Sequence, residues 1–247
     1  MLRTASPRDP SHSAFLACGV AVAVLLGLAA PPVPASETAR LERWRLKAQD
    51  YERRGAWVEA CRCYDEVLRK DRLNPSAREG YLRCCRRWQL AARHLDPLHR
   101  QLLARLTLPQ ALDAYEQILT TVASGHPDRA RTTYAVLFQQ GLNELRMALD
   151  DPAFRQQHLA GVKPAAVQAL KDRLAGWPAR RVASRAEARE QAQMLIRSAA
   201  RDGVAVRPVT ACAFALELAA GACAALDEYS GFPPPTWPRA QAATASW

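Results

Sequence analysis

Apolar side chains recur at spacings of three and four residues along most of the chain, which is the period of an amphipathic helix. Gly55 interrupts the first stripe, and two further stripes follow it. The three stripes consist of Leu41, Trp44, Ala48 and Tyr51; Ala60, Tyr64, Val67 and Leu68; and Tyr81, Leu82, Cys85 and Trp88. The pattern therefore predicts three consecutive helices near the start of the chain.

Helix starts are marked by a short polar side chain followed by proline. The polar side chain can accept hydrogen bonds from the first free amides, and proline suits the first helical turn. These pairs are Asn74-Pro75, Asp96-Pro97 and Asp151-Pro152, and Pro109 and Pro164 are expected in other first turns. Ser184 and Glu187 have the spacing of a capping box, and that helix should end near Gly203. Because strand patterns are nearly absent, the sequence predicts an all-α fold.

The most apolar stretch beyond the amino terminus covers residues 209–226. A membrane span is one interpretation, but Glu217 lies in its middle, where a bilayer would disfavour a charge. We therefore favour a buried, closely packed helix. Residues 36–95 are expected to form a helical hairpin with a capping helix, and residues 96–230 an irregular helical bundle. Residues 231–247 are rich in proline without periodicity and predict a disordered tail.

The amino terminus has the layout of an export signal over residues 1–35. Arg3 and Arg8 precede an uncharged apolar run, and Val33 and Ala35 occupy the −3 and −1 positions of a cleavage site. The alternative is an uncleaved membrane anchor, because the run is near the lower limit of spanning length. The sequence thus predicts an exported protein of the periplasm or cell envelope.

Composition and charge describe a basic globular protein and exclude wholesale disorder. The chain has 247 residues, of which 49% are hydrophobic, and a net charge of +10. Arginine greatly outnumbers lysine, a skew that codon composition explains as well as a binding surface does. The charge permits a nucleic-acid partner without pointing to one, and export makes it a poor expectation. An arginine run near Trp88 is expected to be a solvated helix face or to contact an anionic envelope surface; it consists of Arg83, Arg86, Arg87 and Arg93.

Cysteines and histidines do not form a recognisable site in the sequence. Members of each close cysteine pair face different ways on a helix, so we interpret them as small apolar fillers and leave the disulfide pattern open. The cysteines beyond the signal are Cys61, Cys63, Cys84, Cys85, Cys212 and Cys223, and a metal site formed by the first four is a less favoured alternative. Solvated or capping roles are expected for His94, His99, His126 and His158. We predict no catalytic residue, metal ligand or cofactor.

The segment from Trp44 to Leu68 resembles one tetratricopeptide repeat (TPR), a pair of antiparallel helices. Its framework positions are Trp44, Ala48, Tyr51, Gly55, Trp57, Ala60, Tyr64 and Leu68. The closing proline of the repeat is replaced by Arg72, and Pro75 follows three residues later. The resemblance implies a protein or peptide partner bound beside Trp44, Tyr51, Trp57 and Tyr64. An isolated helix pair cannot bury both of its faces, so this one must pack on the rest of the chain or on a partner.

Residues 221–232 resemble the G-x-x-x-x-L-D-x-x-S-x-aromatic junction of exported S41-type carboxyl-terminal processing peptidases. Residues 138–145 and 151–155 fit the amino-terminal helical region of planctomycete members. In that family the junction leads to a PDZ domain and a core with a serine nucleophile and a lysine base, and nothing in this sequence matches either. The resemblance implies a non-catalytic interaction module. The alternative is a truncated or split peptidase whose PDZ domain and Ser/Lys core lie in another reading frame or on another chain.

Overall fold

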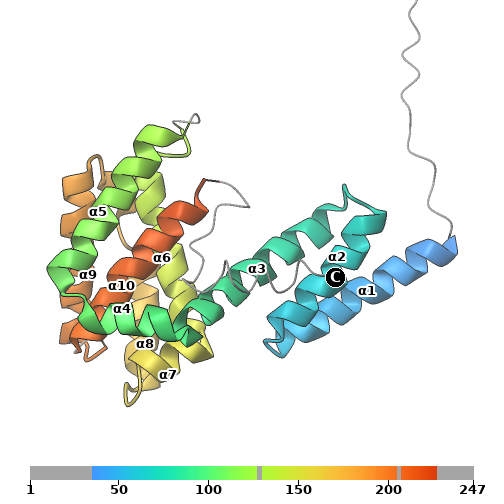
Figure 1. Ribbon diagram of the computed structural model, residues 1–247, viewed down its shortest axis with the longest axis horizontal. Coiled ribbons are helices and arrows are strands. Elements are labelled where there is room, and N and C mark those ends of the chain that lie inside the picture. Colours follow the sequence, from blue (N-terminus) through green and yellow to red (C-terminus); the bar gives the residue numbers. More distant parts are fainter. Residues whose placement is uncertain (1–34, 127–129, 205–206, 227–247) are drawn as a thin grey trace, which may run out of the picture.

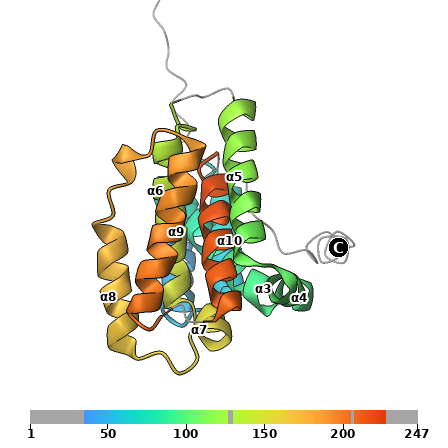
Figure 2. The same cartoon turned by 90° about the vertical axis from the view of Figure 1, so that its left-hand side faces the viewer.

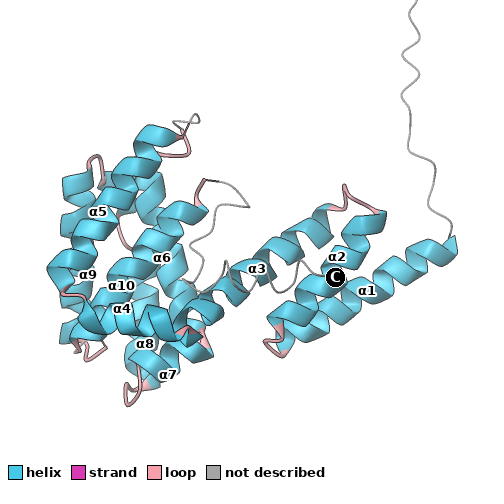
Figure 3. Ribbon diagram, viewed as in Figure 1, coloured by secondary structure: helices cyan, strands magenta, loops and turns pink. Residues whose placement is uncertain are grey.

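The computed structural model describes residues 35–126, 130–204 and 207–226, which form ten α-helices and one short 3₁₀ helix, without a strand (Figure 3). The predicted all-α fold is confirmed for this part of the chain. The export signal expected up to residue 35 lies outside the described residues except for Ala35, and so does the tail expected over 231–247.

Helices α1 (Ala35–Arg53) and α2 (Trp57–Lys70) are joined by a tight turn in which Gly55 has a φ of 72°. Only glycine adopts this conformation without strain, so the turn explains the break in the apolar stripe. Ala48 on α1 and Ala60 on α2 are fully buried, and their small side chains let the two helices approach closely. The assignment of the α1–α2 pair to the TPR class stays a prediction.

Helix α3 (Pro75–Leu95) covers one face of this pair. It begins as predicted, because the Asn74 side chain accepts a hydrogen bond from the Ala77 amide at 2.9 Å. Gly80 lies flat against the ring of Tyr64, where a Cβ atom would overlap the ring carbons. The three helices bury a small apolar cluster of their own, formed by Ala48, Ala60, Cys63, Tyr64, Val67, Ala77 and Cys84.

The remaining helices form a bundle around a second and larger core. Their bounds are α4 (Pro97–Arg105), α5 (Leu108–Gly125), α6 (Tyr134–Asp150), α7 (Pro152–His158), α8 (Pro164–Ala175), a 3₁₀ turn (Ala179–Arg181), α9 (Arg185–Arg201) and α10 (Pro208–Ala224). The predicted caps are confirmed, since Asp96 accepts from the Leu98 amide and Asp151 from the Phe154 amide. The Glu187 carboxylate caps the amide of Ala183.

Helix α10 runs through the centre of the bundle, with α5, α6 and α9 around it (Figure 2). Its residues from Thr210 to Ala222 are all buried, including Glu217. The prediction of a buried helix within 209–226 is therefore confirmed for residues 210–222, whereas the helix ends at Ala224 and residues 223–226 are half-buried. Among the described helices, none combines the length and the apolar character needed to cross a membrane.

Two glycines let α10 and α6 pack with their backbones in contact. A Cβ atom on Gly221 would lie 2.6 Å from the Cα of Gly141 and would also meet the Gln140 carbonyl. A Cβ atom on Gly141 would lie 2.8 Å from the Leu218 carbonyl oxygen. Both glycines belong to segments that resemble the peptidase family, so the described parts of those segments contact each other at these positions.

Replacing Gly221 with alanine is expected to lower the free energy of unfolding by about 1–3 kcal/mol, because the new Cβ can be placed only if the backbones move apart. Urea unfolding followed by circular dichroism measures the loss. The matched control is Gly125→Ala at the end of α5, where nothing lies within 4 Å of the new Cβ. Equal stability of the two variants would contradict this packing.

Helix α3 connects the three-helix unit to the bundle, and its carboxyl end lies against the bundle while α1 and α2 project from it (Figure 1). Ala77 and Cys84 belong to the smaller core, whereas Leu90 belongs to the larger one. In this arrangement none of the other described helices packs extensively on the side of α1 and α2 that α3 does not cover.

Candidate functional site

The open side of α1 and α2 carries a groove of about 490 Å³. Trp44, Lys47 and Tyr51 from α1 form one wall, and of these Trp44 and Tyr51 belong to the predicted apolar stripe. The ammonium group of Lys47 lies 5.2 Å from the centre of the Trp44 ring and 5.8 Å from that of Tyr51. Such a cation–π arrangement is attractive, though weak at an exposed lysine, and it places the ammonium group over both rings.

The opposite wall comes from α2 and carries charges of both signs. Its charged residues are Glu59, Arg62, Asp65, Glu66 and Arg69, with the buried Cys63 between them. Arg69 is paired with Asp65 at 2.8 Å and with Glu66 at 3.1 Å. Acidic groups on α2 thus face a lysine and two aromatic rings on α1, so the groove is polar on one side and aromatic on the other.

The four aromatic residues predicted to bind a partner separate into two groups. Trp44 and Tyr51 are half-buried and share the groove. Trp57 packs against the small core, with the guanidinium of Arg87 5.9 Å from its ring. Tyr64 is only 1% exposed, and its hydroxyl donates to Glu52 at 2.5 Å. Burial and the Glu52 carboxylate raise the pKa of Tyr64, so it is a neutral core residue.

A buried ionic cluster joins the end of α3 to the bundle. Arg93 is 2% exposed and donates to the Glu217 carboxylate through Nε at 3.2 Å and Nη2 at 2.7 Å. The same Nη2 donates to Glu144 at 3.2 Å. His94 Nε2 lies 2.9 Å from Glu217 Oε1, and its Nδ1 lies 3.1 Å from His158 Nε2. Four helices, α3, α6, α7 and α10, therefore meet at one charge network.

The protonation states in this cluster follow from burial and from the arginine. Burial raises the pKa of Glu217, but the charge of Arg93 and the hydrogen bonds with Arg93 and His94 outweigh it and hold that pKa below its usual range. Burial also raises the pKa of Glu144, because the charge of Arg93 and its hydrogen bond to Glu144 oppose the effect of burial only in part. Because Glu217 is ionised, it accepts the hydrogen bond and His94 Nε2 donates it. The cluster is closed to solvent, so it holds helices together and does not act on a ligand.

The structure corrects the expected role of three histidines. His94, His99 and His158 were expected to be solvated or to act as caps, and that expectation is wrong, because each is at most 4% exposed. Burial, reinforced by the neighbouring His94, lowers the pKa of His99 to about 4 and that of His158 to about 3. Both rings are therefore neutral. The signal that could have revealed the cluster is Glu217 itself, since a glutamate inside an apolar helix needs a buried cation.

The arginine side chains of the run on α3 mostly form hydrogen bonds and ion pairs with other helices of the protein. The solvated-face interpretation is wrong for Arg93, which is buried. Arg83 pairs with Glu52 at 2.8 Å, Arg86 donates to the Ala224 carbonyl, and Arg87 donates to the Met147 carbonyl. These contacts tie α3 to α1, α6 and α10.

No family model, curated protein or solved structure matches this chain. Within the described ranges, no three His, Cys, Asp or Glu side chains are grouped as the ligands of a metal ion would be. The groove beside Trp44 and Tyr51 is therefore the candidate site, and its function must be argued from its own geometry.

Proposed function

We propose that this protein is a non-catalytic interaction module that binds a peptide segment of a partner protein in the groove between α1 and α2. The observation that carries the proposal is the pair of half-buried aromatic rings, Trp44 and Tyr51, on a side of the unit that no other described helix covers. Aromatic side chains in a concave surface supply large contact areas at small entropic cost and commonly dominate binding energy.

The shape of the surface favours an elongated ligand. A second hollow, of about 290 Å³, adjoins the groove and shares Trp44 and Lys47 with it. The two hollows follow α1 from Tyr51 back toward its amino end, where Arg40 and Arg43 line the second one. A chain segment can occupy both hollows at once, with its apolar side chains on the aromatic rings.

The charges indicate the composition of the segment. Arg40, Arg43 and Lys47 are exposed along the α1 side of the surface. Carboxylates on the ligand would be attracted to this row, and the attraction would fall as salt screens it. The α2 wall of the groove carries Glu59, Asp65 and Glu66, which would repel a carboxylate there. We therefore propose a peptide whose apolar anchor lies in the groove and whose acidic residues lie beside Arg40 and Arg43 in the adjoining hollow.

Replacing both Trp44 and Tyr51 with alanine is expected to weaken peptide binding at least tenfold, because the apolar anchor loses its contact surface. Peptides are first selected from a displayed library of random sequences on the unmodified protein, and their Kd values are then measured by calorimetry. The matched control is Leu46→Ala, which removes a side chain that is 52% exposed on the same helix. A library that yields no acidic peptide, or peptides that bind both variants alike, would overturn the proposal.

The absence of catalysis and the export are also part of the proposal. Incubation with an unfolded protein such as casein tests the first, and robust cleavage that a single substitution within residues 36–247 abolishes would refute it.

Export is supported by the layout of residues 1–35. Amino-terminal sequencing of protein from the cell envelope should then give a start at Ser36 if the signal is cleaved, or at Met1 if it stays as an anchor. Recovery of the protein from the cytosol alone would argue against export.

A second candidate function is the helical part of an S41-type peptidase assembled from two chains. It is favoured by the close contact of Gly141 with Gly221, which brings together two of the segments that resemble this family. The neighbouring genomic sequence, read in all frames, tests the idea. A PDZ-like and Ser/Lys-bearing product that binds this chain would support it, and the lack of any such reading frame would remove it.

A further inference from the structure

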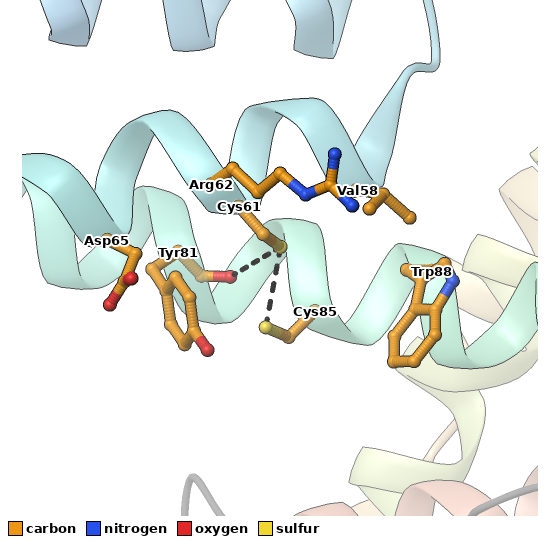
Figure 4. Close-up of a pocket in the computed structure, with 7 residues that line it drawn as sticks. All are labelled: Val58, Cys61, Arg62, Asp65, Tyr81, Cys85 and Trp88. Carbon is orange, nitrogen blue, oxygen red and sulfur yellow. Dashed lines mark hydrogen bonds between the residues drawn. The ribbon is translucent and has the colours of Figure 1, made fainter. Parts of the chain in front are cut away.

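Two cysteines face each other across the seam between α2 and α3. The sulfur atoms of Cys61 on α2 and Cys85 on α3 are 3.5 Å apart, and the Cys61 thiol also points at the Tyr81 carbonyl oxygen at 3.8 Å (Figure 4). The sulfurs of a disulfide are about 2.05 Å apart, so a small side-chain movement brings these two within bonding distance. Both residues are free thiols in this structure.

The neighbouring cysteines differ in their surroundings. Cys63 and Cys84 are buried in the small apolar core, where they act as the apolar fillers that the sequence predicts. Cys61 and Cys85 are half-buried and line a cavity of about 270 Å³, together with Tyr81 and Trp88. A small reagent can therefore reach Cys61 and Cys85 from this cavity more readily than Cys63 or Cys84, which are 3% and 0% exposed.

We propose that Cys61 and Cys85 form a reversible disulfide that cross-links α2 to α3. The cysteine pair lies between α2 and α3, in a cavity that shares Arg62 and Asp65 with the groove. The proposal does not depend on the proposed peptide binding. The sequence-based interpretation of these two cysteines as apolar fillers could not foresee this contact. The spacing of residues within one helix does not show which residue of the next helix lies opposite.

The local chemistry makes Cys85 the attacking group. The hydrogen bond with Cys61 lowers the pKa of Cys85 to about 7, against the opposing effect of burial, and a hydrogen bond with Tyr81 adds to the decrease. Hydrogen bonds with Cys84 and Cys85 raise the pKa of Cys61. Thiol–disulfide exchange needs a thiolate, and a cysteine with a pKa near ambient pH supplies one readily.

The oxidant is a small disulfide, for which oxidised glutathione is the probe. The Cys85 thiolate attacks one glutathione sulfur, the bond between the two glutathione sulfurs breaks, and the first glutathione leaves as a thiolate that takes up the proton lost by Cys85. Cys61 then loses its proton and attacks the Cys85 sulfur, and the second glutathione leaves as a thiol. Two protein thiols are oxidised to one disulfide, and one glutathione disulfide is reduced to two thiols.

The cross-link would close a loop of about 25 residues that contains the turn between α2 and α3. Helix α2 makes its main contacts with α1 and α3 and none of comparable extent with the bundle. A covalent bond to α3, whose other end is fixed in the bundle, would restrain the part of the molecule that the large core does not hold.

The test uses the full chain, incubated with oxidised glutathione at neutral pH and digested without reduction. Mass spectrometry should find a linked pair of peptides that contain Cys61 and Cys85, with a mass loss of about 2 Da relative to the two thiol peptides. Cys61→Ser should trap glutathione on Cys85, and Cys85→Ser should leave Cys61 without a cross-link. The matched control is Cys223→Ala, which removes another half-buried thiol and should leave the link intact.

Two results would overturn the proposal. One is a dominant link through Cys84 or between two molecules. The other is independent alkylation of Cys61 and Cys85 after the oxidation step. Because the unmodified protein supplies the main readout, the linked peptides can be sought even if one of the variants fails to fold.

Discussion

Replacing Arg93 with methionine is expected to lower the free energy of unfolding by about 3–5 kcal/mol, one of the two largest effects we predict for this protein. The substitution keeps an unbranched, flexible stem and removes the guanidinium group with its charge. Glu217 and Glu144 would then be buried without the cation that compensates them, and His94 would still donate to Glu217. The midpoint of urea unfolding, followed by circular dichroism, measures the loss.

A second substitution separates the cost of the orphaned charge from the cost of lost packing. Glu217→Gln keeps an oxygen that can accept from His94 and removes the charge that Arg93 compensates. The double variant Arg93→Met/Glu217→Gln should therefore be more stable than Arg93→Met alone. The control for arginine removal is Arg100→Met on α4, an exposed position where the change should stay within about 0.5 kcal/mol. Strictly additive losses in the double variant would contradict the assignment.

The position of Arg93 explains why this cluster matters for the rest of the molecule. Arg93 and His94 lie in the last turn of α3, the helix that carries α1 and α2. Their partners Glu144, His158 and Glu217 belong to three helices of the bundle. The ionic cluster therefore helps to fix the direction in which the three-helix unit projects, and with it the orientation of the groove.

The helices themselves could be predicted because their signals are local. Asn74, Asp96 and Asp151 each cap the helix that begins with the proline after them, and these signals require only neighbouring residues. The burial of α10 could also be predicted, since the glutamate in its apolar run argues against a membrane. Such features depend on a few turns of one helix and not on the arrangement of several.

The candidate site could be predicted only in part, because its remaining features depend on which helices pack together. Arg93 and Glu217 are 124 positions apart, and nothing in either segment identifies the other as its partner. The aromatic stripe identifies Trp44 and Tyr51 as surface candidates, but Tyr64 lies on the face that α3 covers. Helical periodicity shows which residues share one face of a helix, but it does not show which other helix covers that face.

Acid is expected to destabilise the folded protein, and the cause lies in the buried histidines. In the unfolded chain, His99 and His158 take up protons near pH 6.5. Burial lowers the pKa of His99 to about 4 and that of His158 to about 3 in the folded protein, and the neighbouring His94 contributes. The unfolded state therefore binds more protons between pH 6.5 and these values, so stability falls as the pH is lowered through this window.

Other groups of the cluster modify this slope. The pKa of Glu217 is held below its ordinary value by Arg93 and His94, so its contribution to stability is also lost once the pH falls below about 4.5. The raised pKa of Glu144 acts in the opposite direction, because the folded state then takes up that proton first. Arg207 lowers the pKa of His158 further, whereas Asp96 raises that of His99. The histidines dominate the pH dependence of stability above pH 4.5, since the pKa values of both His99 and His158 are lowered.

The expected result is a loss of roughly 5 kcal/mol between pH 7 and pH 4, measured as the urea midpoint at a series of pH values. The double variant His99→Gln/His158→Gln should lose much less over the same interval, because neither glutamine can take up a proton in the unfolded chain. The matched control is His126→Gln at the carboxyl end of α5, outside the cluster, which should keep the slope of the unmodified protein. If the double variant kept the full slope, the acid sensitivity would have to come from the carboxylates, and the two imidazoles would not be neutral by burial.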